Sequence, residues 1–506
     1  MKPLIFAPTL LTRRRALGGL AALAATSLMP GCGGVSPSAS LSKGIALNPQ
    51  PVPDGSLTSA SVTVTTTSSG SIGPAFAGLA YDKSKLYGTY LSATNSNLLG
   101  LFNQLGPSLL RIGGTGTDKN IWTPDGQGRT AGQIAPADVD SLAAFMKASG
   151  WKCLYGVNLG GAAIGATTPA LAAAEVAYVA EQFGTSLLGI EIGNEPDLYG
   201  NAGSYSAGNW SLAQFEALWS QFREAILAMT PGVAVTGPST ANNAATWTVP
   251  FGEAVTKAEI SLLTQHYYHG NGKSAFATAE HLLKPDEVLQ SDLSTLETGS
   301  QAIGIPFRLA ECNSYDRGGS PGVSNAYASS LWMVDFLYEC AQGGASGVNL
   351  NGGGHGAGYQ PIADENGAVI EIRPEYYGIL LFILAGQGTL YQTQVAAGSL
   401  NVTAYAVSNA SGGSNVIVLN KESTKNLQLT IQLPQGAGAA TLLEMTQLTA
   451  GATGPSLAAL SGVTIQGASV GLDGSFSPAP AYTLTANGSQ VMCYVPALSA
   501  VLIQAT

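Results

Sequence analysis

Two glutamates lie at the ends of apolar segments, where they could work together on one bond. Glu195 follows the run Leu187 to Asn194 (LLGIEIGN), and Glu311 lies in Phe307 to Tyr315 (FRLAECNSY). Cleavage of a glycosidic bond needs such a pair, because one carboxylic acid protonates the departing oxygen while the other carboxylate acts at the anomeric carbon. At a separation of about 5–5.5 Å the second carboxylate is a nucleophile and the anomeric configuration is retained.

These glutamates need a scaffold that brings them together, and residues 72–388 provide a repeating pattern for one. Short apolar runs alternate there with helical segments that start at Pro136, Ser211, Asn325 and Pro374. The eight predicted strands cover residues 75–81, 108–114, 152–160, 187–194, 233–239, 260–268, 307–315 and 347–354. Eight such units predict an α/β fold, a (β/α)8 TIM barrel, with catalytic residues at the carboxyl ends of its strands. Glu195 then ends strand four and Glu311 belongs to the end of strand seven.

The sequence outside the barrel predicts an added all-β sandwich domain. Residues 389–506 consist of short β-branched and apolar runs separated by Gly, Ser and Pro. Residues 58–71 also alternate, and they precede the barrel, so we expect this early strand to pair with the C-terminal strands. The sandwich domain is therefore predicted to combine 58–71 with 389–506.

Composition limits the kinds of partner. The 506 residues include 21 Lys plus Arg against 31 Asp plus Glu, a net charge of -10, and only 10% are charged. This balance argues against nucleic acid or another polyanion, because phosphate binding needs clustered cations. The five cysteines match no disulfide framework. His266 and His269 lack a nearby acidic third ligand, so we expect no metal site.

The N-terminus is predicted to be an export signal over residues 1–33, followed by a linker over 34–57. Arg13 to Arg15 precede the mostly apolar run Ala16 to Met29, as in twin-arginine signals. Cys32 stands where a lipoprotein would be lipidated, although Pro30 fits that pattern poorly. A lipid on Cys32 would attach the protein to a membrane, and the alternative is an incidental cysteine. We expect a periplasmic, extracellular or lipid-anchored protein.

Further polar residues are candidates for the same site. The Asn194 amide could donate to a sugar hydroxyl, Tyr267 could donate to Glu311 or to the sugar, and Arg111 could hold Glu311 ionised. The structural alternative for Arg111 is a salt bridge. Three more candidates have plain alternatives in a turn or in core packing: Asp125 in TPDGQGR, Tyr315 and Tyr359.

Together these motifs resemble the clan of retaining (β/α)8 glycosidases. Within it, RIGG, GNEPDLY, HYY, RLAECNSY and NGGGHGAGY resemble glycoside hydrolase family 79, which includes β-glucuronidases and heparanase, over residues 60–500. The resemblance implies that Glu195 is the acid/base and Glu311 the nucleophile. It also implies that Asn194 and Tyr267 line the sugar subsite and that no metal or organic cofactor is needed.

The resemblance further implies how a uronic acid would be recognised. Bacterial β-glucuronidases of the family bind the substrate carboxylate through tyrosine hydroxyls and a backbone N–H in the strand-eight loop, positions matched by Tyr267, Tyr359 and Gly358. Tyr315 matches a third tyrosine after the nucleophile strand. If Asp316 takes that position instead, its charge would repel a uronate by roughly 1 to 4 kcal/mol at about 4 Å.

Three functions follow as alternatives. The first is a retaining exo-β-glycosidase that removes terminal β-linked glucuronic acid by a two-glutamate mechanism. The second keeps the mechanism but acts on neutral or 6-O-substituted β-glucosides. The third is a non-catalytic sugar-binding lipoprotein. In each case the partner is a small glycoside or oligosaccharide, and we expect a monomer.

Overall fold

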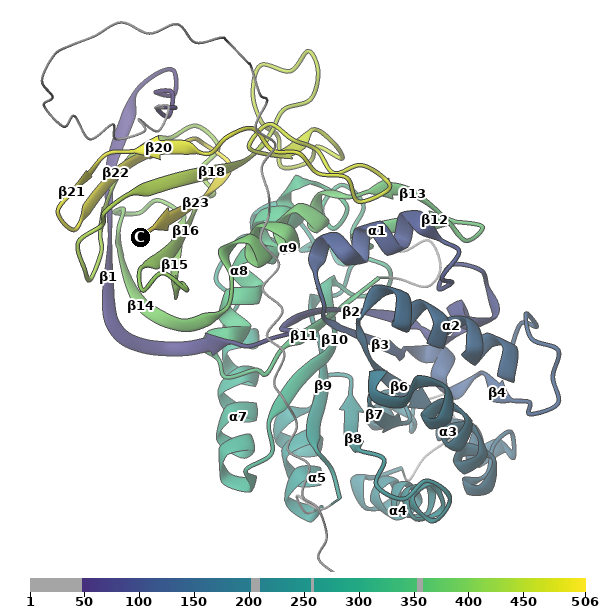
Figure 1. The fold of residues 1–506 in the computed structure, drawn as a ribbon. Helices are drawn as coiled ribbons and strands as arrows, with labels where there is room; N and C mark the ends of the chain where they lie inside the picture. The colour runs from purple at the N-terminus through teal and green to yellow at the C-terminus, as the bar shows by residue number, and fades with distance from the viewer. Residues whose placement is uncertain (1–47, 202–209, 256–258, 353–357) are drawn as a thin grey trace, which may run out of the picture. The chain divides into compact units, whose positions relative to one another are not determined.

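The computed structural model describes residues 48–201, 210–255, 259–352 and 358–506, all within one compact unit from Leu47 to Thr506 (Figure 1). The predicted export signal (1–33), with Cys32, and most of the predicted linker lie outside the described residues. In the ranges that are described, none of the helices combines the length and the apolar character needed to cross a membrane.

Eight parallel strands close into the predicted barrel. They are adjacent in the order β2-β3-β6-β7-β8-β9-β10-β11, and β11 pairs again with β2. Their bounds are β2 (Ala77–Asp82), β3 (Leu109–Gly113), β6 (Lys152–Val157), β7 (Leu187–Ile192), β8 (Val235–Thr240), β9 (Leu262–Gly270), β10 (Phe307–Tyr315) and β11 (Val348–Asn351). Each of the eight predicted strands is confirmed; Glu311 lies in the seventh, and Glu195 follows the fourth.

The helices surround the barrel (Figure 1). They are α1 (Ser96–Leu105), α2 (Pro136–Ser149), α3 (Pro169–Phe183), α4 (Leu212–Met229), α5 (Val249–Ala254), α6 (Ala279–Leu282), α7 (Glu287–Ile303), α8 (Tyr327–Gln342) and α9 (Pro374–Ala385). Local sequence explains the ends of α2: Asp138 accepts a hydrogen bond from the Ala135 N–H at 3.0 Å, and Gly150 takes the left-handed conformation that ends the helix.

Short elements complete the barrel loops. They are the single helical turns η1 (Lys83–Tyr87), η2 (Thr115–Asp118), η3 (Gly160–Ile164), η4 (Gly184–Ser186), η5 (Pro196–Leu198) and η6 (Ala244–Thr248), the pair β4 (Ile121–Trp122) with β5 (Gln133–Ile134), and the hairpin β12 (Ile362–Glu365) with β13 (Ala368–Ile372). Several of them follow the carboxyl ends of barrel strands, where the candidate site lies.

An 11-stranded sheet forms the added all-β domain. Its strands are β1 (Leu57–Ile72), β14 (Gly388–Ala396), β15 (Val402–Ser408), β16 (Ser414–Asn420), β17 (Asn426–Gln432), β18 (Ala440–Gln447), β19 (Val463–Ile465), β20 (Tyr482–Leu484), β21 (Ala486–Asn487), β22 (Gln490–Val495) and β23 (Ser499–Ala505). The early strand β1 pairs antiparallel with β14 and parallel with β17, as expected from its alternation. The sheet curls around its own apolar core.

The predicted linker ends earlier than expected. Residues 48–56 lie against the C-terminal sheet: Pro49 bridges to Thr483, and Gln50 exchanges two hydrogen bonds with the Tyr494 backbone at 2.8 and 2.9 Å. The linker boundary at residue 57 is therefore wrong, because Gln50 satisfies backbone groups of the strand beside it.

Helix α8 connects the barrel to the sheet. The Asp335 carboxylate accepts hydrogen bonds from Thr403 at 2.6 Å and Tyr405 at 2.9 Å, and pairs with Lys421 at 2.6 Å. The ring of Tyr338 stacks on Tyr405 with centroids 4.6 Å apart. Because α8 has neighbours on both sides, it is buried over nearly its whole circumference.

This interface contains a carboxyl group that should make stability depend on pH. Burial, then the negative charges of Asp335 and Asp286, raises the pKa of Glu339 to about 8, and Lys421 opposes the shift. A folded-state pKa above the unfolded value favours the protonated form, so its stabilisation is present at low pH and is lost as pH rises through about 8.

We expect Glu339→Gln to raise the midpoint temperature of unfolding at pH 8.5 by about 1–3 °C, and to change it little at pH 4, where the native carboxyl is already neutral. Thermal unfolding followed by circular dichroism at several pH values measures this. Glu365→Gln, an exposed change in β12, is the control. An equal effect of Glu339→Gln at both pH values would contradict the assignment.

Candidate active site

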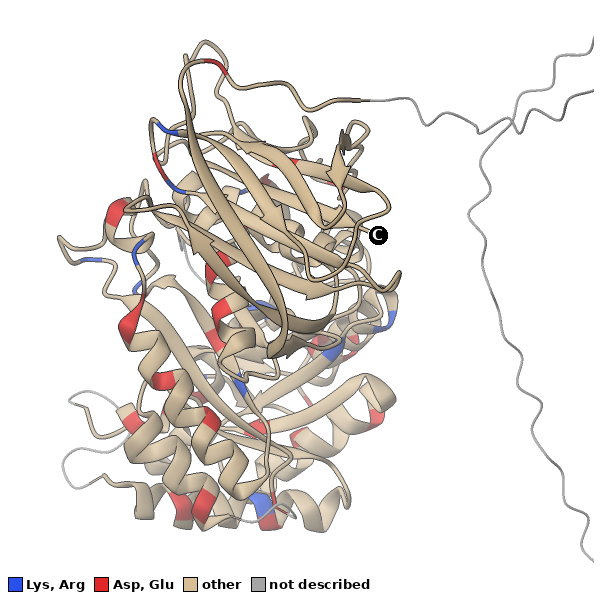
Figure 2. Cartoon of the chain, turned by 90° about the vertical axis from the view of Figure 1, so that its left-hand side faces the viewer, with Lys and Arg blue, Asp and Glu red and all other residues tan. Residues whose placement is uncertain are grey.

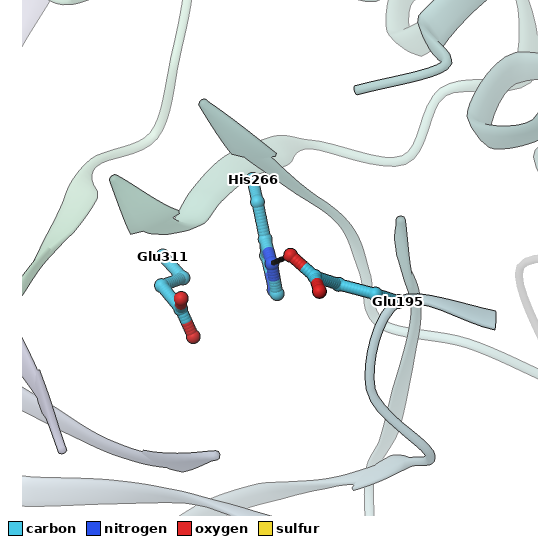
Figure 3. Close-up of side chains that lie close together, drawn as sticks. All are labelled: Glu195, His266 and Glu311. Atoms are coloured by element: carbon cyan, nitrogen blue, oxygen red, sulfur yellow. Dashed lines mark hydrogen bonds and ion pairs between the residues drawn. The ribbon is translucent and has the colours of Figure 1, made fainter. Parts of the chain in front are cut away.

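The two predicted glutamates meet at the carboxyl end of the barrel. One oxygen of Glu195 and one oxygen of Glu311 lie within 4.8 Å of each other and of a ring nitrogen of His266 (Figure 3). Both glutamates line a cavity of about 770 Å³. The Glu195 side chain is 26% exposed and that of Glu311 is 10% exposed, so each carboxyl group is accessible from the cavity.

Glu311 is held by three donors. Its Oε1 accepts hydrogen bonds from the Tyr268 hydroxyl at 2.8 Å and from Asn351 Nδ2 at 3.1 Å, and its Oε2 pairs with Arg111 at 2.8 Å. Burial by itself would raise the pKa of Glu311, but His266, Arg111 and the hydrogen bonds from Tyr268 and Arg111 lower it below the usual value. The group is therefore ionised at neutral pH, as a nucleophile requires.

Arg111, on β3, is fully buried and joins four acceptors. Its Nε pairs with Glu191 at 2.6 Å and its Nη1 with Glu311 at 2.8 Å. Its Nη2 donates to Asn194 Oδ1 at 2.8 Å and to Ser239 Oγ at 2.9 Å. Burial disfavours the charge, but the two glutamates outweigh it and raise the pKa of Arg111. The expected contact with Glu311 is thus confirmed.

Glu195 occupies a constrained backbone position in the loop after β7, three residues beyond Ile192. Its φ of 51° lies in the left-handed region, and its N–H donates to the Ser239 carbonyl at 2.8 Å. Its Oε1 forms a hydrogen bond with His266 Nδ1 at 3.1 Å, and His266 Nε2 bonds Ser239 Oγ at 3.0 Å. Both ring nitrogens of His266 are engaged, so the ring orients the Glu195 carboxyl group toward the cavity.

Asn194 lies between these groups. Its Oδ1 is occupied by Arg111, and within the described ranges its Nδ2 has no hydrogen-bond partner. The amide N–H groups can therefore donate to a bound hydroxyl, which is the role that the sequence suggested.

The structure corrects the position of one tyrosine. The Tyr267 hydroxyl donates to Asp286, and its ring stacks on Phe336 with centroids 6.1 Å apart, outside the barrel. Tyr268 instead contacts Glu311 and lines the cavity. Successive strand residues face opposite sides, so moving the assignment by one residue exchanges the two tyrosines. The alternation through Thr264 and His266 was the signal that could have found Tyr268.

The residues after the seventh strand also differ from expectation. Tyr315 does not line the cavity: its hydroxyl donates to the Thr278 carbonyl at 3.2 Å and its ring packs on His269. Asp316, the next residue, lines the cavity and accepts a hydrogen bond from the Gly272 N–H at 3.1 Å. Strand β10 ends at Tyr315 and the chain turns at Asp316, which reverses the expected orientation.

The last three predicted residues have different outcomes. Tyr359 lines the cavity, and its hydroxyl accepts a hydrogen bond from Asn351 at 3.3 Å. The Gly358 N–H donates to the Gly318 carbonyl at 2.5 Å, so this amide is not free for a ligand. Asp125 is exposed in the turn between β4 and β5 and does not line the cavity.

Several residues that line the cavity were not predicted from the sequence. Asp82 ends β2, Asn351 ends β11, and Lys119 and Arg317 follow strands two and seven. Their positions at strand ends were the available signal. The cavity thus has carboxylates from Asp82 and Asp316 in addition to the two glutamates, together with two cations.

A metal could be considered at the three groups Glu195, His266 and Glu311, the cluster of possible ligands found among the described residues. The Arg111 guanidinium lies 2.8 Å from Glu311 and would repel a divalent cation there. His266 and His269 do not form the ligand pair that their spacing suggests, because His269 Nδ1 forms a hydrogen bond with Asp286 Oδ2 at 2.6 Å.

Sequence comparison finds related glucuronidases. No family model matches the chain. A β-glucuronidase of Aspergillus niger is 26% identical over 256 residues, 45% of this chain and 46% of the relative. A β-glucuronidase of Neurospora crassa is 25% identical over 276 residues, 47% of this chain and 49% of the relative. The chain thus spans about half the length of the curated relatives it matches.

Solved structures share the fold over most of the chain. A 4-O-α-L-rhamnosyl-β-D-glucuronidase from Fusarium oxysporum, in complex with Rha-GlcA, has a TM-score of 0.69 at 15% identity and covers 87% of this chain and 100% of its own. A GH51 arabinofuranosidase from Xanthomonas axonopodis has a TM-score of 0.64 at 14% identity, covering 88% and 100%. These similarities show the fold, a TIM barrel with an additional β domain.

Proposed function

We propose that the chain is a retaining exo-β-glycosidase of the family 79 type, acting on terminal β-linked glucuronic acid. The approach of a Glu195 oxygen to within 4.8 Å of a Glu311 oxygen carries this proposal. Carboxyl groups about 5–5.5 Å apart suit a double displacement, whereas inversion needs about 6.5–9.5 Å so that a water fits between them. The names of the two sequence relatives support the choice of glucuronide.

The contacts suggest a role for each group in the first step. The ionised Glu311 attacks the anomeric carbon as the bond to the departing oxygen breaks, and Glu195 gives its proton to that oxygen. Tyr268 and Asn351 hold the nucleophile at Oε1, and Arg111 holds it at Oε2. Because all three donors favour the carboxylate, they keep Glu311 ionised until it reacts.

In the second step the glycosyl-enzyme is hydrolysed. Glu195, now a carboxylate, takes a proton from a water whose oxygen attacks the anomeric carbon, and the bond to Glu311 breaks. His266 remains bonded to Glu195 Oε1 and so keeps the acid/base directed at the reacting oxygen. The N–H groups of Asn194 are free to bind the sugar hydroxyl beside the anomeric carbon.

A neutral or 6-O-substituted β-glucoside is the second candidate, because Asp316 and not Tyr315 lines the cavity. A carboxylate at this position repels a uronate, although Lys119 and Arg317 add positive charge to the same lining. Figure 2 shows Lys and Arg scattered among more numerous Asp and Glu, which favours a small glycoside over a sulfated polymer.

Hydrolysis of 4-nitrophenyl β-glucuronide and 4-nitrophenyl β-glucoside by the purified protein tests the proposal. We expect turnover in which the β-anomer is the first product released. Proton NMR during the reaction identifies the anomer. Faster cleavage of the glucoside would mean that the substrate is a neutral glucoside and not a glucuronide. Initial release of the α-anomer would contradict the double displacement, and absence of turnover with retained binding would favour a sugar-binding lipoprotein.

Asp316 should control the preference between the two sugars. We expect Asp316→Asn to raise the ratio of kcat/KM for glucuronide over glucoside by about fivefold or more, since a repulsion of about 1 kcal/mol is removed. The matched control is Asp125→Asn, an aspartate outside the cavity, which should leave the ratio unchanged. An unchanged ratio in Asp316→Asn would show that this carboxylate does not face the discriminating part of the substrate.

We also propose that the protein is exported. The predicted signal, residues 1–33 with Cys32, lies outside the described residues, so export needs its own test. Fractionation of cells producing the protein and its Cys32→Ser variant tests lipid attachment. Loss of the protein from the membrane fraction in the variant is expected if Cys32 carries the lipid, and equal membrane content would exclude it.

A further inference from the structure

A buried aspartate next to the candidate site joins three barrel loops. Asp118, at the end of η2, is 4% exposed. Its Oδ1 accepts hydrogen bonds from the Leu159 and Gly160 N–H groups, both at 2.9 Å. Its Oδ2 accepts from the Asn194 N–H at 3.1 Å and from the Tyr199 hydroxyl at 2.6 Å. One carboxylate therefore connects the loops that follow β3, β6 and β7.

The loop after β7 needs such support. Glu195 has a left-handed backbone, which costs a non-glycine residue about 1–2 kcal/mol. Its own N–H is held by the Ser239 carbonyl. Asp118 holds the residue directly before Glu195 and, through Tyr199, the residue that follows η5. The turn that carries Glu195 is thus fixed on both sides by the same carboxylate.

The charge on Asp118 has no cation to balance it in these contacts. Burial raises the pKa of Asp118, and the hydrogen bonds from Tyr199, Gly160, Leu159 and Asn194 oppose this rise. An asparagine would have the same shape at position 118 but only one acceptor oxygen. Its NH2 group would face either the N–H groups of Leu159 and Gly160 or the two donors of the Asn194–Tyr199 turn. Because an NH2 group cannot accept a hydrogen bond, one of these two pairs of contacts would be lost.

We propose that Asp118 is a positioning residue that sets the direction of the Glu195 carboxyl group by holding the Asn194–Tyr199 turn. The inference rests on the proposed function, in which Glu195 is the general acid. Misplacement of a catalytic group by about 1 Å can cost about 10²-fold, and general acid catalysis contributes about 10²–10⁴-fold. The loss should therefore appear where protonation of the leaving group matters.

Aryl glycosides with different leaving groups test this directly. The probes are 2,4-dinitrophenyl and phenyl glycosides of whichever sugar the native protein cleaves faster, glucuronide or glucoside. Dinitrophenolate departs without a proton, whereas phenolate needs one. For Asp118→Asn we expect kcat/KM to fall about 10²-fold with the phenyl glycoside and less than about threefold with the dinitrophenyl glycoside. Tyr199→Phe, which keeps the carboxylate, should give a smaller loss of the same kind.

Asp138→Asn is the matched structural control. Asp138 is also buried and accepts hydrogen bonds from two backbone N–H groups, of Ala135 and Arg129, at the start of α2. Both aspartate variants should unfold at lower temperature, but Asp138→Asn should keep the native dependence on the leaving group. If Asp118→Asn does not fold, Tyr199→Phe supplies the readout.

Glu195→Ala separates this inference from the proposed function. Selective loss with the phenyl glycoside in Glu195→Ala and in Asp118→Asn supports both. Selective loss in Glu195→Ala, with equal losses on the two substrates in Asp118→Asn and Tyr199→Phe, overturns the positioning role alone. Equal losses on both substrates in Glu195→Ala overturn the acid assignment and the positioning role together.

Discussion

Glu311→Gln should abolish turnover, lowering kcat by at least about 10⁴-fold, because the amide cannot form the glycosyl-enzyme. Binding should survive. The variant side chain has the same shape, and its amide oxygen can still accept from Tyr268 and Asn351, which contact Oε1 in the native protein. We expect a substrate dissociation constant within a few-fold of the native KM, measured by calorimetry.

The control for this prediction is Glu365→Gln, which alters an exposed carboxylate of β12 and should keep full activity. A 2-deoxy-2-fluoro glycosyl fluoride of the preferred sugar should label the native protein at Glu311, as detected by mass spectrometry of its peptides. Turnover by Glu311→Gln above about 1% of native, or labelling at another carboxylate, would refute the nucleophile assignment.

Arg111→Met should be the most destabilising single change at the site. It would leave Glu191 and Glu311 buried without the cation that pairs with them at 2.6 and 2.8 Å. Removal of one partner from a buried ion pair costs about 3–5 kcal/mol of unfolding free energy. Denaturant unfolding measures this loss. The double variant Arg111→Met/Glu191→Gln should recover part of it, since one uncompensated charge is gone.

The same change should alter the pH dependence of activity. In the native protein the lowered pKa of Glu311 means that its stabilisation is present above the unfolded-state pKa and is lost as pH falls through the folded value. Without Arg111 the Glu311 pKa rises, so the acid limb of kcat/KM should move to higher pH. Arg111→Lys keeps a charge and should shift the limb less. An unchanged limb in Arg111→Met would mean that Arg111 does not control the ionisation of Glu311.

Local patterns in the sequence were sufficient to predict the scaffold. The apolar runs and the helices between them follow from hydrophobic periodicity, and this alone predicted all eight barrel strands and the extra β-domain. Because the carboxyl ends of barrel strands meet at one face, the same pattern predicted that Glu195 and Glu311 would lie close together. The contact between Arg111 and Glu311 followed from the same reasoning.

The identity of the cavity-lining tyrosines depended on finer detail. The choice between Tyr267 and Tyr268 is a choice of strand face, and one residue of register reverses it. Near Glu311 the pairing of β10 with β9 contains an irregularity between Leu309 and Glu311. Such a shift changes which later residues face inward, so the sequence pattern could not decide between Tyr315 and Asp316.

Periodicity within each segment was sufficient to predict the barrel, its order of strands and the meeting of two carboxylates at its mouth, because hydrophobic spacing is a local property of the chain. The side chains that surround those carboxylates depended instead on how the closed barrel brings distant segments together. The contacts of Asp118 with Asn194, of Arg111 with Glu191 and of Tyr268 with Glu311 join residues from different strands and loops. Hydrogen bonds of this kind depend on atomic distances across the closed barrel, and no local pattern encodes them.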